Sequence, residues 1–172
     1  ELQKERGMTA GFIGSEGESF GDSIGGQRSS VDSAAEAFFD QRDSVDERVF
    51  SPAALEQIDS IGRQWNSTDR IRTRVNGLDI PAGEAISHYT SLNGRLMGFV
   101  GTLARLTSEG ELTRQVAAYY NFLEAKDLAG IERAVLSKAF AQDGMSMDEL
   151  QNYLSLLGKE QAFLTSFRTF AS

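Results

Sequence analysis

The sequence predicts an all-α protein, an elongated antiparallel helical bundle built from one or two four-helix-bundle-like halves. Apolar residues recur at helical spacing along most of the chain, no window alternates convincingly with period two, and only two prolines occur, Pro52 and Pro81. Antiparallel bundles bury apolar stripes of this kind. We expect residues 1–172 to form a single helical domain, which is long enough to bury a sound core.

Three helices are expected in the first half of the chain. The first covers about residues 1–13 and ends in the Gly-rich turn GSEGES. The second runs over about residues 19–48, and its inward row is apolar except at Arg28 and Arg42. The third begins at Ser51-Pro52, an N-cap followed by proline at the first helical position, and ends at Asn76-Gly77.

Three more helices are expected after Pro81. The fourth carries apolar residues at heptad spacing: Tyr89, Leu92, Leu96, Phe99, Leu103 and Leu106. Ser108 and Glu111 have the spacing of a capping box and begin the fifth, which reaches about Gln142. Ser146 and Glu149 repeat that spacing at the start of the sixth, whose inward stripe is Leu150, Leu154, Leu157, Leu164 and Phe167.

Composition argues against several classes of function. The net charge is -8, and the 17 basic residues are scattered among 25 acidic ones, so nucleic acid is not an expected partner. With no Cys and a single histidine, His88, neither a transition-metal site nor a catalytic triad is expected, and a lone histidine is usually a surface or satisfied core residue. The run GFIGSEGESFGDSIGG lacks the Gly-Lys-Ser/Thr ending of a phosphate loop. We therefore expect no enzyme activity, no catalytic residues and no cofactor.

Two arginines occupy positions where apolar residues normally face a core. Arg6 shares one helical stripe with Leu2, Thr9 and Ile13, and Arg133 shares another with Leu123, Lys126, Gly130, Ser137 and Phe140. Each has a glycine nearby, Gly7 and Gly130, and glycine inside a helix usually marks a close approach or room for a ligand.

Sequence physics leaves two interpretations of these arginines open. They pair with glutamates across the bundle, or their guanidinium groups converge on an anion between helices. Arg28 is a candidate third member, although Asp32, four residues further on, offers it an ordinary ion pair.

The two ends of the chain resemble the nitrate- and nitrite-sensing (NIT) domain family. The N-terminal resemblance lies in LQKERGMTAGFI and the following QRSSVD. The C-terminal resemblance lies in YYNFLEAKDLAGIERAVLSKAF and YLSLLGKEQAFLTSF. The region from about residue 45 to 111 matches only as generic helix.

This resemblance implies an all-helical sensor domain rather than an enzyme. The family's nitrate-responsive arginines match Arg6 and Arg133, so the expected ligand site consists of Arg6, Arg133, Thr9 as a hydroxyl donor and Gly130. The expected ligand is a small anion, nitrate or nitrite, whose binding relays a shift between helices to an output domain.

The resemblance also carries expectations about context. Most relatives are receptors, which predicts the periplasmic input domain of a membrane chemoreceptor such as a methyl-accepting chemotaxis protein. Such a receptor is a homodimer that meets the membrane only through flanking segments absent here. A cytoplasmic location is the alternative. Two other functions stay open, a ligand-free helical dimerisation or interaction module and a sensor of another small anion.

Overall fold

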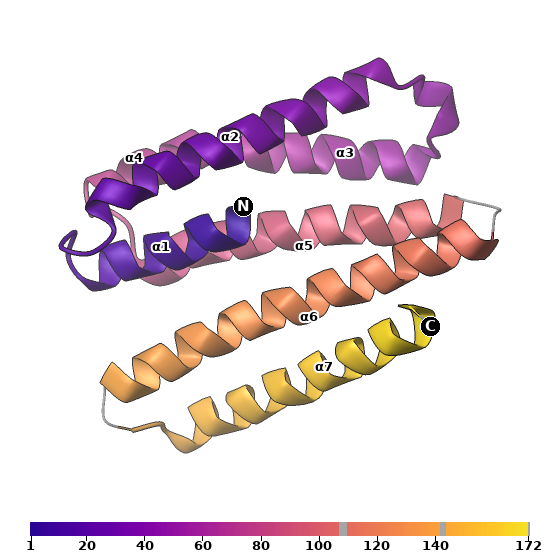
Figure 1. The fold of residues 1–172 in the computed structure, drawn as a ribbon. Helices are drawn as coiled ribbons and strands as arrows, with labels where there is room; N and C mark the ends of the chain where they lie inside the picture. Colours follow the sequence, from indigo (N-terminus) through magenta and orange to yellow (C-terminus); the bar gives the residue numbers. More distant parts are fainter. Residues whose placement is uncertain (107–109, 142–143, 172) are drawn as a thin grey trace. The chain divides into compact units, whose positions relative to one another are not determined.

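A computed structural model describes residues 1–106, 110–141 and 144–171, and it confirms the all-α prediction. Within these residues the helices are α1 (Leu2–Gly14), α2 (Gly21–Ser44), the 3-10 helix η1 (Glu47–Val49), α3 (Pro52–Trp65), α4 (Thr68–Asn76), α5 (Ala82–Leu106), α6 (Gly110–Ala141) and α7 (Met147–Ala171) (Figure 1).

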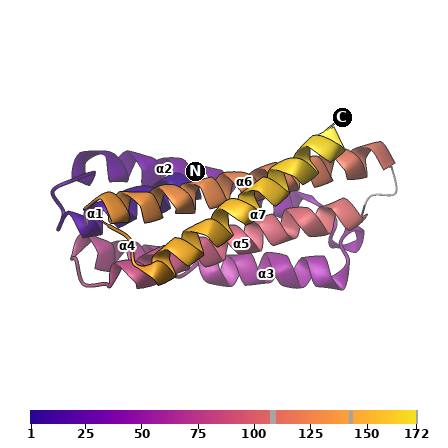
Figure 2. The same ribbon diagram turned by 90° about the horizontal axis from the view of Figure 1, so that it is seen from below.

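The chain divides into two compact units, residues 1–99 and 100–172. Unit 1 contains α1 to α4 and most of α5. Unit 2 contains the end of α5 and the hairpin of α6 and α7, which lie side by side in both ribbon views (Figures 1 and 2). The prediction of one domain stays a prediction, since each unit is compact by itself.

Helix ends follow the capping signals of the sequence. The Ser51 hydroxyl accepts a hydrogen bond from the Ala54 amide at 3.2 Å, ahead of α3. Before α7 the Ser146 amide donates to Glu149 Oε2 at 2.9 Å, and the Glu149 amide donates to Ser146 Oγ at 3.2 Å. The capping box at Ser146 is therefore confirmed, whereas the one expected at Ser108 lies outside the described residues.

The predicted third helix is interrupted, and the structure has α3 and α4 in its place. The break falls at Asn66 and Ser67, where the Ser67 hydroxyl donates to the Gln64 carbonyl at 2.7 Å. Short polar side chains compete with the helix for its backbone groups, which favours a break where several occur in a row. The predicted second helix is also shorter than expected, because its last turn is replaced by an extended residue, Val45, and by η1.

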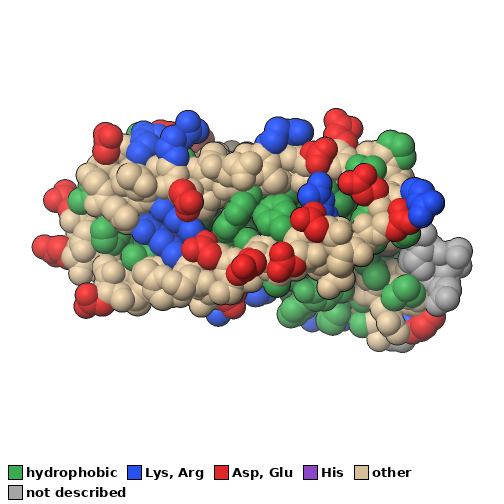
Figure 3. All heavy atoms as spheres, turned by 90° about the horizontal axis from the view of Figure 1, so that it is seen from above, with side chains coloured by type: hydrophobic (Ala, Val, Ile, Leu, Met, Phe, Trp, Pro, Cys, Tyr) green, Lys and Arg blue, Asp and Glu red, His purple; other side chains and the backbone are tan. Residues whose placement is uncertain are grey.

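One cluster of core residues in unit 1 lies between α4, α5 and α1. It contains Ile71, Val75, Ile80, Ala85 and Tyr89, with Leu2, Phe12 and Ile13 packed against it. The heptad stripe predicted for α5 is buried at Tyr89, Leu92 and Phe99. Acidic and basic side chains are interspersed around hydrophobic ones on the face seen in Figure 3.

The inward stripe predicted for the last helix is partly wrong. Leu150 and Leu154 are 40% and 56% exposed, whereas Leu156, which the stripe omits, is buried. A hairpin of two helices covers only one side of each helix, so a helix that is apolar on several sides leaves leucines exposed. Among the described helices we find none long and apolar enough to cross a membrane.

Candidate functional site

Arg6 is buried in the first helix, with only 5% of its surface exposed. Its Nη1 donates to Oγ1 of Thr90 on α5 at 3.2 Å. Thr9, one turn further along α1, is completely buried. A Cβ at Gly7 would meet no atom within 4 Å, so this glycine is not required for a close approach of helices. The inward direction predicted for Arg6 and Thr9 is thus seen in the structure.

Glu5, the neighbour of Arg6, forms a buried ionic cluster that the sequence did not predict. Its carboxylate is fully buried and receives two hydrogen bonds from Arg72 on α4, Nε to Oε1 at 2.7 Å and Nη2 to Oε2 at 2.8 Å. The hydroxyl of Tyr89 donates to Oε1 at 2.8 Å, and Nε of Arg28 lies 3.6 Å from the same oxygen. The charge of Glu5 is therefore matched by groups other than Arg6.

Arg72 extends this cluster toward the surface. Its Nη1 donates to Asp32 Oδ1 at 2.6 Å, and its guanidinium carbon lies 5.7 Å from the centre of the Trp65 ring. Burial lowers the pKa of Arg72, but the carboxylates of Glu5 and Asp32 outweigh burial and raise it. Arg72 stays charged at any pH at which the protein is folded.

Arg28 does not make the ion pair that its spacing from Asp32 suggests. Asp32 accepts from Arg72, while Arg28 Nη1 donates to Oδ1 of Asn76 at 2.7 Å. The Nε and Nη2 atoms of Arg28 are buried without a hydrogen-bond partner. Arg28 thus belongs to the Glu5 cluster, and its role as a third anion-binding arginine stays a hypothesis.

Two aromatic side chains of α5 border the Glu5 cluster. Burial, the negative charge of Glu5 and the hydrogen bond to it raise the pKa of Tyr89 to about 12. His88 is buried, with Nδ1 3.1 Å from Gln64 Nε2 and Nε2 3.0 Å from Thr68 Oγ1, and burial lowers its pKa. His88 is therefore a core histidine with both nitrogens hydrogen-bonded, in line with the structural interpretation of a lone histidine.

Arg133 and Gly130 belong to α6 in unit 2, whereas Arg6 and Thr9 belong to unit 1. Arg133 is exposed, and Gly130 is partly buried. Beside Arg133, burial and the nearby Glu160 carboxylate raise the pKa of Glu132. The joint site of Arg6 and Arg133 stays a prediction.

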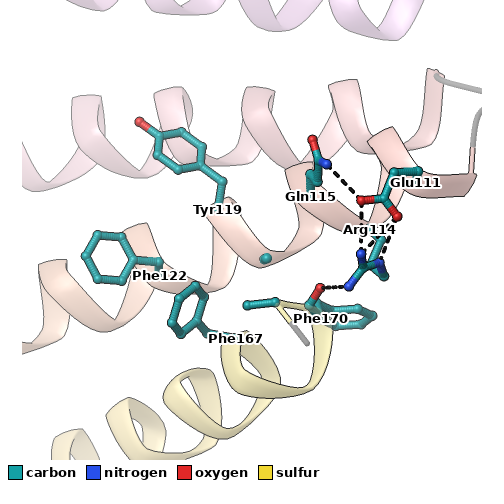
Figure 4. A pocket seen from close by; sticks show the side chains of 9 residues that line it. Glu111, Arg114, Gln115, Tyr119, Phe122, Phe167 and Phe170 are labelled. Atoms are coloured by element: carbon teal, nitrogen blue, oxygen red, sulfur yellow. Dashed lines mark hydrogen bonds and ion pairs between the residues drawn. The ribbon is translucent and has the colours of Figure 1, made fainter.

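Unit 2 also carries an aromatic hollow near the end of α7 (Figure 4). It is lined by Glu111, Arg114, Gln115, Ala118, Tyr119, Phe122, Phe167, Phe170 and Ala171. Arg114 donates to both Glu111 oxygens at 2.9 Å and to the Phe170 carbonyl at 2.9 Å. An anion in this hollow would have to compete with Glu111 for the guanidinium group of Arg114.

Exposed aromatics on α7 would favour the interaction module, because large exposed apolar patches mark association surfaces. Of the four Tyr and Phe residues of α7, Phe170 is 39% exposed, whereas Tyr153, Phe163 and Phe167 are partly buried. Phe163 contacts Tyr120, and Phe167 contacts Phe122, with ring centres 6.5 and 5.5 Å apart. Most of these rings thus pack within the hairpin.

A curated protein and a solved structure are similar to this chain. The "Nitrate regulatory protein" of Klebsiella oxytoca is 28% identical over 101 residues, which are 59% of this chain and 26% of that protein. The solved structure of the NasR transcription antiterminator superposes with a TM-score of 0.89 at 24% identity, over 99% of this chain and 46% of that one. The chain thus spans less than half the length of either relative.

These relatives correct three expectations about context. A regulatory protein and a transcription antiterminator are not membrane chemoreceptors, so the prediction of a receptor input domain is wrong. Excluding nucleic acid as a partner is wrong too, because an antiterminator acts on transcription. The prediction of a periplasmic location depended on the receptor prediction, so it is wrong as well. The charge argument failed because the net charge of one domain says nothing about a partner bound elsewhere in a longer protein.

The family itself is confirmed by a match over the whole chain. The family model described as nitrate and nitrite sensing matches residues 1–172, including the central helices that resembled the family only as generic helix. The likeness of fold to the antiterminator agrees with this match. The chain therefore belongs to the nitrate- and nitrite-sensing (NIT) family.

Proposed function

We propose that this domain senses nitrate or nitrite by binding the anion at Arg6, and that Arg133, Thr9 and Gly130 contribute to the same site. The observation that carries the proposal is the burial of the Arg6 guanidinium group next to Glu5, whose carboxylate is bound by residues of α4 and α5. Glu5 accepts from Arg72 and Tyr89. A buried guanidinium group, here at 5% exposure, can donate in a planar fork to the oxygens of a small anion.

The chemistry of nitrate suits such a site. Nitrate is planar and singly charged and has only acceptor oxygens, so a guanidinium group can donate to two of them at once. Each charge-assisted hydrogen bond contributes about 1.5–3 kcal/mol, so two arginines would support binding in the micromolar range after ordering costs. Gly130, one turn before Arg133, would leave room for the ligand on α6.

Binding would act by favouring one packing of the helices over another. A ligand shifts such an equilibrium only by its differential affinity for the two packings, typically worth about 1–3 kcal/mol. The α1 helix is placed to carry the shift, because Arg6 contacts α5 while Glu5 contacts α4. A movement of α1 on nitrate binding would therefore act on two helices of unit 1 together.

The output we propose is control of transcription, because the solved structure that this chain resembles is that of a transcription antiterminator. In a protein as long as those relatives, nucleic acid would be the partner of the output and the cytoplasm the place of action. The anion would be the signal that the present domain receives.

Thermal unfolding with a series of anions tests this function. At constant ionic strength, nitrate at about 100 times its dissociation constant should stabilise the domain by about 2.7 kcal/mol. For a chain of this size that corresponds to an increase in Tm of roughly 5–10 °C. Chloride and acetate should give much smaller increases.

Arg6→Lys and Arg133→Ala are the informative variants. Lysine keeps the charge but loses the planar fork, so Arg6→Lys should remove most of the nitrate effect. Arg63→Ala is the matched control, since Arg63 is an exposed arginine of α3 with no role in the proposed site. A nitrate effect equal in all variants would place the site elsewhere, and no anion effect on the wild type would contradict anion sensing.

A further inference from the structure

The side-chain amide of Asn93 on α5 is buried without a hydrogen-bond acceptor. The residue is 7% exposed, and its Nδ2 has no partner among the described residues. Buried amide groups nearly always find a partner, because an unpaired one loses its hydration without compensation. An unpaired donor of this kind points to a ligand that supplies the acceptor.

Asn93 lies on the face of α5 that meets α1. Thr90 is three residues before it and contacts Arg6, while Tyr89 is four residues before it and contacts Glu5. Residues three and four apart are neighbours on one helix face. The Asn93 amide thus lies one turn beyond the contact between Arg6 and Thr90.

The hydroxyl of Thr90 adds a second donor. Its Oγ1 accepts a hydrogen bond from Arg6 at 3.2 Å, which leaves the hydroxyl hydrogen for another acceptor. Thr90 is half-buried, and among the described residues no hydrogen bond donated by its hydroxyl is found. On the α1 side, the buried Thr9 hydroxyl also has no hydrogen-bond partner, although it lies close enough to the Tyr89 hydroxyl to oppose the increase in its pKa.

We infer that Asn93 and Thr90 are anion-binding residues of the nitrate site, donating from the amide and the hydroxyl to oxygens of the anion that Arg6 binds. This inference rests on the proposed function and names the α5 side of the same site. Arg6 supplies the charge, and the two neutral donors reach oxygens that one guanidinium group cannot cover. The ligand class is a small planar oxyanion, because the site offers donors on two sides and chloride could not use them in the same directions.

The test is a calorimetric titration of nitrate into the 172-residue chain carrying Asn93→Leu or Thr90→Val. Leucine is close to asparagine in size and removes the donor. We expect Asn93→Leu to weaken nitrate binding at least about tenfold, the effect of losing one hydrogen bond to a charged group. Thr90→Val should weaken it about three- to tenfold. Asn93→Asp, which keeps the shape but places an acceptor at the anion, should also lose binding and covers the case in which the leucine variant does not fold.

Gln57→Leu is the control. Gln57 on α3 also has an unpaired buried polar atom, but that atom is the acceptor Oε1, which an anion cannot use. The affinity for nitrate should therefore be unchanged in this variant. In a nitrogen–proton correlation spectrum, the side-chain amide signals of Asn93 are identified by their absence from the spectrum of Asn93→Leu. These signals should shift when nitrate is added to the wild type.

The outcomes separate the inference from the function on which it rests. One outcome would overturn the inference: the wild type binds nitrate, Arg6→Ala does not, and Asn93→Leu binds nitrate as the wild type does and has a higher Tm. Asn93 would then be only an unpaired amide in the core. If the wild type binds no nitrate, the proposed function fails and the inference with it. If the affinity for nitrate falls in the Asn93 and Thr90 variants and is unchanged in Gln57→Leu, the result supports both the inference and the proposed function.

Discussion

Arg72 binds both carboxylate oxygens of Glu5 in the interior of unit 1, with Nε 2.7 Å from Oε1 and Nη2 2.8 Å from Oε2. The two residues are 67 positions apart in the sequence, so this contact fixes α1 against α4. A buried pair of this geometry stabilises the fold only while both partners are present, since either charge alone is costly to bury.

Removing Arg72 should therefore destabilise the domain strongly. In Arg72→Leu the Glu5 carboxylate stays buried, and among the described residues Tyr89 and Arg28 are the polar partners that remain. We expect a loss of about 3–5 kcal/mol in the free energy of unfolding. Urea unfolding measures this value. The control is Arg74→Ala, which breaks the more exposed pair with Glu84 and should cost less than about 1 kcal/mol.

The double variant Glu5→Gln, Arg72→Leu tests the reason for this loss. Without the carboxylate there is no uncompensated charge to bury, so the double variant should be more stable than Arg72→Leu alone. An equal or larger loss in the double variant would show that Arg72 acts through packing against Trp65 instead.

Tyr89 should make stability fall at alkaline pH. Its pKa is raised to about 12 in the folded state, from about 10 in an unfolded chain. The folded state therefore holds the proton more tightly, so this stabilisation is complete below pH ~10 and is lost as the pH rises toward ~12. Unfolding of the wild type and of Tyr89→Phe at a series of alkaline pH values measures it. The wild type should lose more stability than the variant over this interval, and parallel curves would contradict the assignment.

His88 should make stability fall at mildly acidic pH. Burial lowers its pKa in the folded state, so the neutral ring is favoured there. The contribution of neutral His88 to stability is complete above the pKa of about 6.5 that a histidine has in the unfolded chain. It is lost as the pH falls from there through the lower pKa of the folded state. The nitrogen shifts of the ring, followed by NMR, should show His88 neutral at a pH where a free imidazole is half charged. A titration at or above pH ~6.5 would contradict this account.

The raised pKa of Glu132 means that the contribution of this residue to the stability of unit 2 should fall as the pH rises from acid to neutral. Burial and the Glu160 carboxylate raise the pKa of Glu132, so its stabilisation is present below the unfolded pKa of about 4.3 and is lost as the pH rises through the folded value. Glu160→Gln should stabilise the neutral protein slightly, by about 0.5 kcal/mol or less because solvent screens the pair. Glu124→Gln is the control, because Glu124 is on α6 with Glu132 but is not the carboxylate that raises the pKa of Glu132. Equal effects of Glu160→Gln and Glu124→Gln on stability would argue against a Glu132–Glu160 interaction.

Much of the fold could be predicted from local sequence signals. Ser51-Pro52 and the Ser146–Glu149 capping box mark helix starts because they satisfy backbone amides within a few residues. The break between α3 and α4 was missed because Asn66 and Ser67 are compatible with a helix until their side chains compete for its carbonyls. The exposure of Leu150 and Leu154 was missed because an apolar stripe does not tell how many neighbours a helix has.

The candidate site, like the fold, was predictable from the sequence only in part. The stripe of Leu2, Thr9 and Ile13 was sufficient to predict an inward Arg6, since helical periodicity fixes the direction of a side chain. The contact of Glu5 with Arg72 was not predictable, because it joins helices far apart in the chain and Glu5 lies one position off that stripe. Asn93 gave no signal in the sequence, because only the structure shows a buried amide to be unpaired.

Calorimetric titration of nitrate into the wild type, Arg6→Ala and the control Arg63→Ala tests the central claim most directly. We predict saturable nitrate binding to the wild type and to Arg63→Ala, and a loss of at least about a hundredfold in affinity for Arg6→Ala, the effect of two charge-assisted hydrogen bonds. Circular dichroism would establish that each variant is folded. Nitrate binding by a folded Arg6→Ala protein with unchanged affinity would contradict the claim that the buried Arg6 binds the anion.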